Sequence, residues 1–339
     1  MERVDVVIVG QGVVALAAAT RAAHDGVRAL FVDRGPRLAN AESLSRVPAS
    51  VLERLGLEAA ATEQAIGPSP SEDHAVLTST IGQALERRAR SAGVAIQNAP
   101  RRPIELKLEA GGWLVTVEGG EPVRAPLLIL AEDARALLAE ELGIGRTQRT
   151  TEDAAEIATW VAATWLLPPS ELGKHSTAWV RTGAAPLTRS ELLAGRDRVT
   201  LRVGPIWAAE NGSAQHPAVV SAVSRAAREL GLPPVATTVE VEEVRLDAMP
   251  CPTAFDGGLV IGAGAGHASR VPGIGIELDL DLGEEVGRAA ARAVLAEDFT
   301  TRALELALGD AYRALFERAA LPALVTTPRP VFSGFAPRA

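Results

Sequence analysis

Cysteine is almost missing from this 339-residue sequence, which holds only Cys251. A lone cysteine excludes an internal disulfide, a four-cysteine iron–sulfur cluster and a thiolate zinc site, and it fits a reducing compartment. No segment reaches about 18 uninterrupted apolar residues, and the N-terminal MERVDVVIVG has neither a basic leader nor a cleavage site. We therefore expect a cytoplasmic chain that is neither secreted nor membrane-spanning, and peripheral contact with a membrane stays open.

The sequence also lacks an excess of positive charge. It has 34 Lys and Arg against 42 Asp and Glu, which gives a net charge of −8. Because binding to the phosphate backbone depends on clustered Lys and Arg, we expect no nucleic-acid partner. Paired-histidine metal spacing, a serine nucleophile elbow and a second G-x-G-x-x-G in mid-chain are absent. These absences argue against a metal site, a hydrolase and a separate nicotinamide domain.

The beginning of the chain predicts a βαβ unit. An apolar run at 4–9 is typical of a buried parallel strand, an alanine-rich stretch closing with Gly26 is typical of a helix, and VRALFVD predicts a second buried strand. Between the first strand and the helix, VGQGVVALA places two glycines and an alanine at G-x-G-x-x-A. Asp33 follows at the end of the second strand, as a dinucleotide-binding fingerprint requires.

This first glycine turn predicts dinucleotide binding. A glycine at position 10 allows the tight turn, one at position 12 lets a diphosphate approach the backbone, and the diphosphate would sit at the helix N-terminus. Asp33 would accept hydrogen bonds from a ribose diol. The predicted contacts are Gly10, Gly12, Val13, Ala15, Asp33 and Arg34. The alternative is a tight turn with a purely structural role.

The rest of the chain divides into two kinds of pattern. After a proline-punctuated loop, a short helix in PASVLERLGL and a polar crossing at GPSPSEDH, we expect a helix at about 78–92, strands around AGG, a buried strand at 127–130 and a helix in ARALLAEELG. The stretch from about 150 to 250 is strand-rich: IATWVAATWLL, STAWVRT, RVTLRVGPIW and TTVEVEEVRL, with one helix in HPAVVSAVSRAARELG. It predicts an antiparallel sheet.

A second glycine turn, LVIGAGAGHASRVPGIG, occupies 259–275. Its strand at 258–262 is expected to rejoin the first sheet, and the helix that starts near Gly273 would then point its N-terminus at the ligand of the first turn. A reduced flavin is negatively charged at its N1–C2=O edge, which a helix N-terminus stabilises. The pattern therefore favours FAD over NAD. The predicted contacts here are Gly262, Ala263, Gly273, Gly275 and Ile276.

Several stretches together resemble the FAD-dependent oxidoreductases of the geranylgeranyl reductase and FixC type, which are related to electron-transfer flavoprotein:quinone oxidoreductase. They are DVVIVGQGVVALAAA, LLILAEDARALLAEELGI, STAWVRTG, GGLVIGAGAGHASRVPGIGIELDLDLG and EDFTTRALELALGDAYRALFERA. The resemblance implies FAD, a two-lobed fold and electron transfer to a quinone or isoprenoid-like acceptor. It also implies a cofactor contact from Asp133, in the A-E-D-A stretch.

Three positions depart from the family pattern. Ala263 replaces an aspartate of the ring-binding segment, Thr78 replaces an arginine at the start of the 78–92 helix, and Gly82 replaces an aspartate. Each lost hydrogen bond to a charged or polar ligand group costs on the order of 1.5–3 kcal/mol. The departures therefore predict that FAD is bound weakly or lost.

Other candidate residues have competing interpretations. His267 could move a proton at the flavin ring, or it is a structural loop histidine. The acids at the start of the last lobe's helix either complement the helix dipole in solvent or act at the flavin ring, where they would oppose a reduced, anionic flavin. They are Glu277, Asp279, Asp281, Glu284 and Glu285. The tryptophans that either wall an apolar acceptor pocket or pack the second sheet are Trp160, Trp165, Trp179 and Trp207.

We thus predict an α/β fold: a three-layer, Rossmann-like FAD-binding lobe with a parallel sheet (1–150 plus 251–320), an inserted antiparallel-sheet substrate lobe (151–250) and a tail (321–339). The expected function is an FAD-dependent oxidoreductase that serves a small-molecule or quinone-like acceptor and takes electrons from an electron-transfer protein or a reduced nicotinamide. One alternative is a flavin monooxygenase or halogenase-like enzyme. Another is a non-catalytic homologue that acts as an interaction or assembly subunit.

Overall fold

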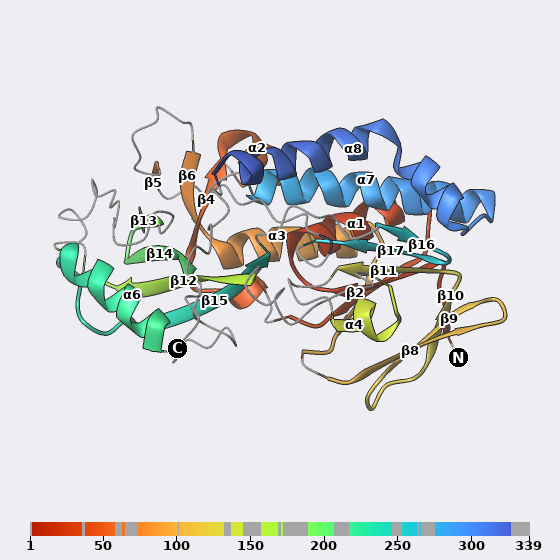
Figure 1. The fold of residues 1–339 in the computed structure, drawn as a ribbon, viewed down its shortest axis with the longest axis horizontal. Coiled ribbons are helices and arrows are strands. Elements are labelled where there is room, and N and C mark those ends of the chain that lie inside the picture. Colours follow the sequence, from red (N-terminus) through yellow and green to blue (C-terminus); the bar gives the residue numbers. More distant parts are fainter. Residues whose placement is uncertain are drawn as a thin grey trace, which may run out of the picture.

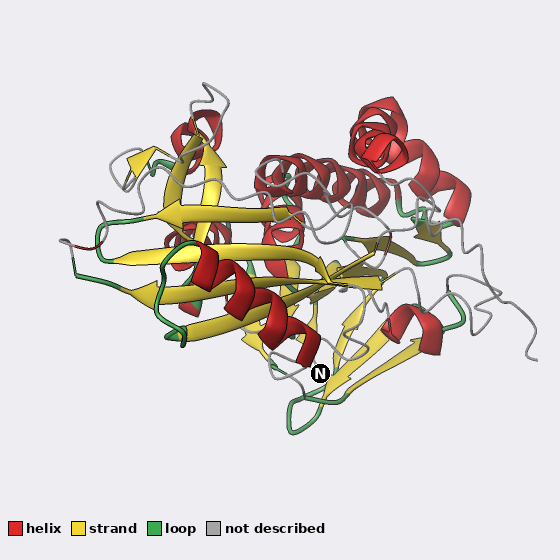
Figure 2. Ribbon diagram, turned by 60° about the vertical axis from the view of Figure 1, so that its left-hand side comes forward, coloured by secondary structure: helices red, strands yellow, loops and turns green. Residues whose placement is uncertain are grey.

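Two lobes lie side by side in the computed structural model, and each has its own sheet (Figures 1 and 2). The structure describes residues 2–35, 38–57, 63–64, 73–100, 102–131, 137–144, 157–168, 171, 189–206, 217–245, 253–262, 265 and 275–326. Among these, no helix is both long enough and apolar enough to cross a membrane.

The larger lobe is built on a six-stranded sheet of order β16-β17-β11-β2-β3-β7. Its strands are β2 (Val6–Gly10), β3 (Ala29–Asp33), β7 (Ala95–Asn98), β11 (Leu127–Ala131), β16 (Ala254–Phe255) and β17 (Gly258–Ile261). Every pair is parallel except β16 with β17 at the edge. The predicted return of the chain to the first sheet is confirmed, because β17 pairs with β11 and β11 pairs with β2.

This sheet is the middle of three layers, which confirms the predicted fold class (Figure 1). The helices on one face are α1 (Gly12–His24), α3 (Thr78–Ser91), α7 (Gly275–Ala296) and α8 (Thr301–Thr326), the last kinked at Gly309. The other face carries β1 (Glu2–Arg3), β8 (Ile104–Glu109), β9 (Gly112–Val117), β10 (Val123–Ala125) and α4 (Leu137–Glu141). Alternate residues of β2 enter the two cores. Val6 and Ile8 pack against the helices, and Val7 and Val9 pack against the small sheet formed by β1, β10, β9 and β8.

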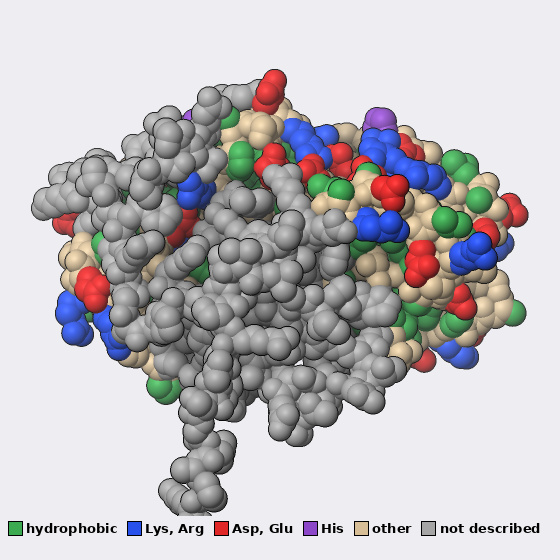
Figure 3. All heavy atoms as spheres, turned by 45° about the horizontal axis from the view of Figure 1, so that its top comes forward, with side chains coloured by type: hydrophobic (Ala, Val, Ile, Leu, Met, Phe, Trp, Pro, Cys, Tyr) green, Lys and Arg blue, Asp and Glu red, His purple; other side chains and the backbone are tan. Residues whose placement is uncertain are grey.

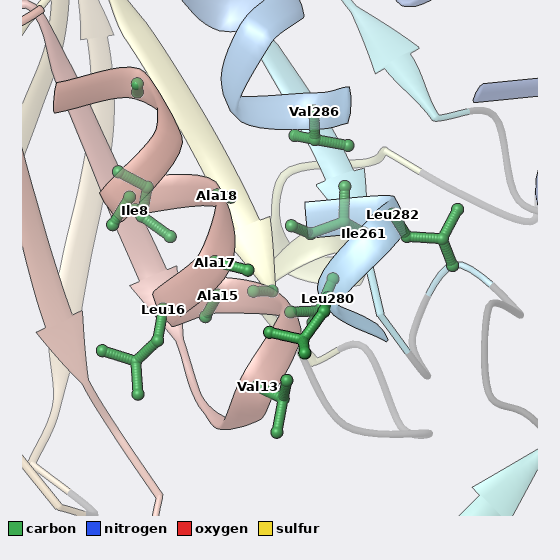
Figure 4. Packing of buried hydrophobic residues seen from close by; sticks show 14 of the residues in the cluster. Ile8, Val13, Ala15, Leu16, Ala17, Ala18, Ile261, Leu280, Leu282 and Val286 are labelled. Atoms are coloured by element: carbon green, nitrogen blue, oxygen red, sulfur yellow. The ribbon is translucent and has the colours of Figure 1, made fainter. Parts of the chain in front are cut away.

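Helices α1 and α7 pack unusually closely through small residues (Figure 4). A Cβ at Gly283 would collide with the backbone of α1 at Val14, and one at Gly287 would collide with the carbonyl of Ala18. The contact moves forward four residues on both helices together, so the two helices run parallel. Their N-termini therefore point toward the same edge of the sheet.

The smaller lobe is an antiparallel sheet of order β13-β14-β12-β15. Its elements are β12 (Ile157–Leu166), β13 (Arg189–Ala194), β14 (Arg198–Ile206), α6 (Pro217–Glu229) and β15 (Thr238–Arg245). Strand β13 was not predicted, and the predicted strand STAWVRT lies outside the described residues. Helix α6 covers one face of the sheet, where it shares an apolar core with β12, β13 and β14.

A small sheet between the lobes corrects the sequence-based expectation for this region. It has the order β4-β6-β5 and consists of β4 (Leu44–Pro48), β5 (Glu63–Gln64) and β6 (Asp73–Leu77); the 3₁₀ turn η1 (Leu38–Asn40) precedes it, and α2 (Ala49–Leu55) follows β4. The short helix was predicted correctly, but the loop before it contains a strand. The last two residues of the polar stretch GPSPSEDH, which was expected to be a surface loop, are the first residues of β6.

Candidate cofactor site

The strands that precede the two glycine turns, β2 and β17, end at the same carboxyl edge of the six-stranded sheet. Ala131 at the end of β11 pairs with Gly10 on one side and with Ile261 on the other. Since neighbouring strands are about 4.8 Å apart, the ends of β2 and β17 are separated by roughly 10 Å. Strand ends that lie some 250 residues apart in the chain therefore stand near each other at one edge of the sheet, as the sequence predicted for the strand at 258–262.

Gly10 and Gly12 have different reasons to be glycine. A Cβ at Gly10 would overlap the backbone of Ala131, so this residue allows β2 and β11 to approach each other. Gly12 has a φ of +84°, and a Cβ built there would meet nothing within 4 Å. The backbone of Gly12 thus borders open space at the start of α1. This is where the fingerprint requires room for a diphosphate.

The N-terminus of α1 has no capping side chain among the described residues. Gln11, the N-cap residue, makes no side-chain capping hydrogen bond, and the first turn holds no acidic residue. The first N–H groups of a helix need partners, and the helix dipole favours a negative one. An anion at this position would supply partners that the described side chains do not.

Asp33 ends β3 beside Gly10 and is buried, with 8% of its surface exposed. Its Oδ1 accepts a hydrogen bond of 3.1 Å from the N–H of Gly35, which bends the chain back after the strand. The side chain of Gln11 lies so close to Gly35 that a Cβ there would collide with it. This contact was not predicted from the sequence, although the Asp-Arg-Gly order is a usual signal for such a turn.

The helix of the second turn begins beyond the first helix. Gly283 packs against the stretch from Val14 to Ala18, whose middle lies about four residues after the start of α1. Gly283 itself lies eight residues after the start of α7 at Gly275. At 1.5 Å per residue, α7 therefore starts about 6 Å further out than α1. Two parallel helix N-termini consequently face the same edge, as predicted for the diphosphate and ring ends of a flavin cofactor.

Not all of the predicted contacts can be placed. Gly262 follows β17 with a φ of +78°, and Ile276 packs its side chain against the helical core in the first turn of α7. Val13 and Ala15 are buried between α1 and α7. Asp133, Ala263, His267 and Gly273 lie outside the described residues.

The residues around the first turn fit a dinucleotide such as FAD. Gly12 leaves a cradle that a Cβ would enter, and α1 presents uncapped N–H groups to it. In addition, Arg34 Nε is buried and has no hydrogen-bond partner among the described residues. A phosphate or ribose oxygen near this atom would satisfy a donor that is costly to leave unpaired.

Two departures from the family pattern acquire structural explanations. Thr78 is buried, and its Oγ1 lies 2.7 Å from Ser45 Oγ and 3.2 Å from Ser43 Oγ, so this hydroxyl belongs to a polar contact between α3 and β4. A Cβ at Gly82 would collide with the backbone of Leu38 and Ala39 in η1. Both residues are therefore engaged within the protein.

The acids of α7 make specific contacts. Asp281 Oδ1 and Glu284 Oε1 lie 2.7 and 2.6 Å from the guanidinium of Arg54 in α2. Burial opposes the positive charge of Arg54, but the hydrogen bonds to Glu284 and Asp281 outweigh this effect and raise its pKa. Figure 3 shows acidic and basic side chains lying side by side over the described part of this face. Asp281 and Glu284 are thus tied to α2, in addition to any effect on the helix dipole.

The tryptophans divide between the two interpretations. Trp165 is buried under α6, and its Nε1 donates to the carbonyl of Pro233 at 3.0 Å, which is structural packing. Trp160 lies on the opposite face of the sheet, against Gly204. Trp179 and Trp207 lie outside the described residues.

The comparisons with solved structures agree on the fold. One match is a geranylgeranyl bacteriochlorophyll reductase-like protein from Thermoplasma acidophilum, with a TM-score of 0.74 and 15% identity over 96% of this chain and 86% of the other. This chain has the fold of these proteins. The p-nitrophenol 4-monooxygenase PnpA from Pseudomonas putida matches with a TM-score of 0.66 and 14% identity, covering 96% and 89% of the two chains. A variant of the halogenase PltM in complex with FAD matches with a TM-score of 0.64 and 12% identity, covering 95% and 75%. No protein-family model and no curated protein matches the sequence.

Proposed function

We propose that this chain is an FAD-dependent oxidoreductase. It would pass electrons through the flavin from a donor, either a partner flavoprotein or a reduced nicotinamide, to an acceptor such as a quinone or an isoprenoid. The observation that carries the proposal is that β2 and β17, the strands before the two glycine turns, end at one sheet edge. The N-cap residue of α1, which follows β2, makes no side-chain capping hydrogen bond. The fold shared with a structure that holds FAD supports it.

FAD would supply the electron carrier, and the chain would bind and orient it. The backbone N–H groups at Gly12 and Val13 would receive the diphosphate, and the buried carboxylate of Asp33 would receive the ribose diol. The guanidinium of Arg34 would add a positive charge at the diphosphate and ribose end of the cofactor. The N-terminus of α7 would stabilise negative charge at the ring end.

The proposal is tested by titrating FAD into the protein and following the quenching of flavin fluorescence, with Gly12→Val as the disrupting variant. A valine side chain at position 12 would enter the space that the diphosphate needs. Losing two charge-assisted hydrogen bonds would weaken FAD binding at least roughly a hundredfold.

Gly26→Val is a matched control at the other end of α1. Gly26 has a φ of +91°, close to that of Gly12, and its Cβ would also meet nothing within 4 Å. Both variants carry similar backbone strain, on the order of 1–2 kcal/mol, but only the first blocks the cradle. Equal FAD affinity in the two variants would contradict the proposed site.

A second candidate function is a non-catalytic assembly subunit. The observation that favours it is the engagement of Thr78 and Gly82 in contacts with β4 and η1. A colourless preparation that takes up no added FAD would support this second candidate, whereas absorbance in the flavin bands would support the oxidoreductase.

A further inference from the structure

The side-chain amide of Gln11 stands at the cofactor edge with no hydrogen-bond partner among the described residues. Gln11 ends the tight turn between β2 and α1 and is the N-cap residue of the helix, but its amide makes no capping hydrogen bond. The residue is half-buried. A carboxamide has two donor hydrogens, and a donor that is removed from water is costly to leave unpaired.

Gly35 holds this side chain in one place. A Cβ at Gly35 would collide with Gln11 Oε1, and it would lie 2.7 Å from Gln11 Cβ and 3.1 Å from Cδ. The φ of Gly35 lies outside the left-handed region, so the backbone conformation does not require a glycine here, whereas the space taken by Gln11 does. The amide nitrogen is not among the atoms nearest to Gly35, so the oxygen faces this residue and the nitrogen points away from it.

Gln11 lies between the two proposed contacts of the dinucleotide. Gly10 pairs with Asp33 across β2 and β3, and the N–H of Arg34 donates to the carbonyl of Gly10 at 2.8 Å. The side chain of Gln11 therefore extends from the end of β2, where the Gly12 cradle begins, to the turn after β3. A ligand that reached from the cradle to Asp33 would lie alongside this side chain.

The charged groups at this point balance each other. Asp33 is negative, and the neighbouring Arg34 is positive, with a buried Nε that has no hydrogen-bond partner among the described residues. A diphosphate would meet no excess of cations from this pair. Its stabilisation would depend on neutral donors, which are the first N–H groups of α1 and any side-chain amide within reach.

The geometry points to Gln11 as a further cofactor-binding residue, whose side-chain amide donates a hydrogen bond to the diphosphate. This assignment rests on the proposed function, and it adds a side-chain donor to the backbone N–H groups of Gly12 and Val13. It also gives Gly35 a role, because the absence of a side chain there keeps the amide seated beside the cradle. Position 11 must then be uncharged, since a carboxylate of the same shape would repel the diphosphate.

The test is a titration of FAD into the full chain, followed by flavin fluorescence, with ADP as a competitor. Gln11→Met keeps the length of the side chain but removes the donor, and it should weaken FAD binding roughly ten- to a hundredfold. Gln11→Glu keeps the shape and adds a negative charge, so the loss should be larger, and the additional part should shrink in about 0.5 M salt. ADP contains the diphosphate but no flavin, and its affinity should fall by the same factors.

A control and a double-mutant cycle separate this contact from general effects. Ser221→Glu adds the same charge on the exposed side of α6, in the other lobe, and should change neither affinity. Gly35→Ala should weaken FAD binding several-fold in the parent protein, because the added methyl group displaces the amide. In the Gln11→Gly background that space is free, so Gly35→Ala should leave FAD affinity unchanged.

The assignment is overturned if Gln11→Met or Gln11→Glu binds FAD as tightly as the parent protein while circular dichroism shows a folded chain. It is also overturned if the effect of Gly35→Ala persists in the Gln11→Gly background. Gly12→Val, measured in parallel, keeps the two proposals apart. A loss of affinity in Gly12→Val without one in Gln11→Met defeats only this assignment, whereas a parent protein that binds neither FAD nor ADP defeats both.

Discussion

The close packing of α1 on α7 determines where both helix N-termini lie, and Gly283→Ala tests it. A Cβ at this position would approach the Ala17 Cβ to 2.6 Å and the N of Ala18 to 3.1 Å, whereas real contacts of this kind are longer. The atoms that would have to move belong to a helix backbone and a methyl group in the core, so a side-chain rotation cannot relieve the overlap. The helices must instead separate.

Two opposing effects set the size of the change. Overpacking a core by one methyl group costs typically 1–3 kcal/mol, while replacing glycine by alanine inside a helix gains about 1 kcal/mol. We expect a net loss of about 1 kcal/mol in the free energy of unfolding for Gly283→Ala. Adding Gly287→Ala, whose Cβ would collide with the carbonyl of Ala18, should bring the loss to about 2–3 kcal/mol.

Urea denaturation followed by circular dichroism measures both changes, with Leu295→Ala as the control. Leu295 belongs to the same helix but is 75% exposed, so its truncation should change the midpoint little. FAD affinity should fall in the double variant as the α7 N-terminus moves away from the cofactor edge. A midpoint equal to or above that of the parent protein in the double variant would refute the packing argument.

Three other substitutions probe the frame of the site. Gly10→Ala should prevent FAD binding in the fluorescence titration and lower the thermal midpoint, because its Cβ would overlap the backbone of β11. Trp113→Phe should lower the free energy of unfolding by about 1–2 kcal/mol in urea, since it removes the Nε1 hydrogen bond of 2.7 Å to the carbonyl of Gly257. Asp5→Asn tests a pH dependence: a side-chain hydrogen bond from Arg28 holds the pKa of Asp5 below the ordinary value of an aspartate. The stabilisation is therefore present above about pH 4 and is lost as the pH falls through the lowered value, so the variant should be less stable than the parent near neutral pH and indistinguishable from it in strong acid.

The cofactor lobe could be predicted because its signals are local. Strand β2 is apolar at every position, as a strand buried on both faces must be. The glycine spacing after it is typical of the turn between a strand and a helix in a dinucleotide-binding fold. The return of β17 was also readable, since its four residues are apolar and a glycine turn follows. Each of these patterns is decided within about ten residues, where sequence reasoning works best.

The small sheet between the lobes could not be predicted for the opposite reason. Strand β4 has only five residues, LSRVP, and it ends on a proline, which signals a loop. Its partner β6 follows some 30 residues later. The side chains of β4 pack against two different lobes. Val47 enters the helical core, while Leu44 packs against Leu193 of the sheet lobe. Long-range pairing, rather than local preference, makes this segment a strand.

The two residues just before β4 connect the two lobes. On the side of the sheet lobe, Glu240 of β15 accepts hydrogen bonds from the N–H groups of Glu42 and Ser43, at 2.9 and 3.2 Å, and from Ser43 Oγ at 2.6 Å. On the other side, the N–H of Thr78 donates to the carbonyl of Ser43 at 2.9 Å, at the start of α3. A single residue, Ser43, therefore touches both lobes. The position of the sheet lobe relative to the cofactor edge therefore depends on this short connection.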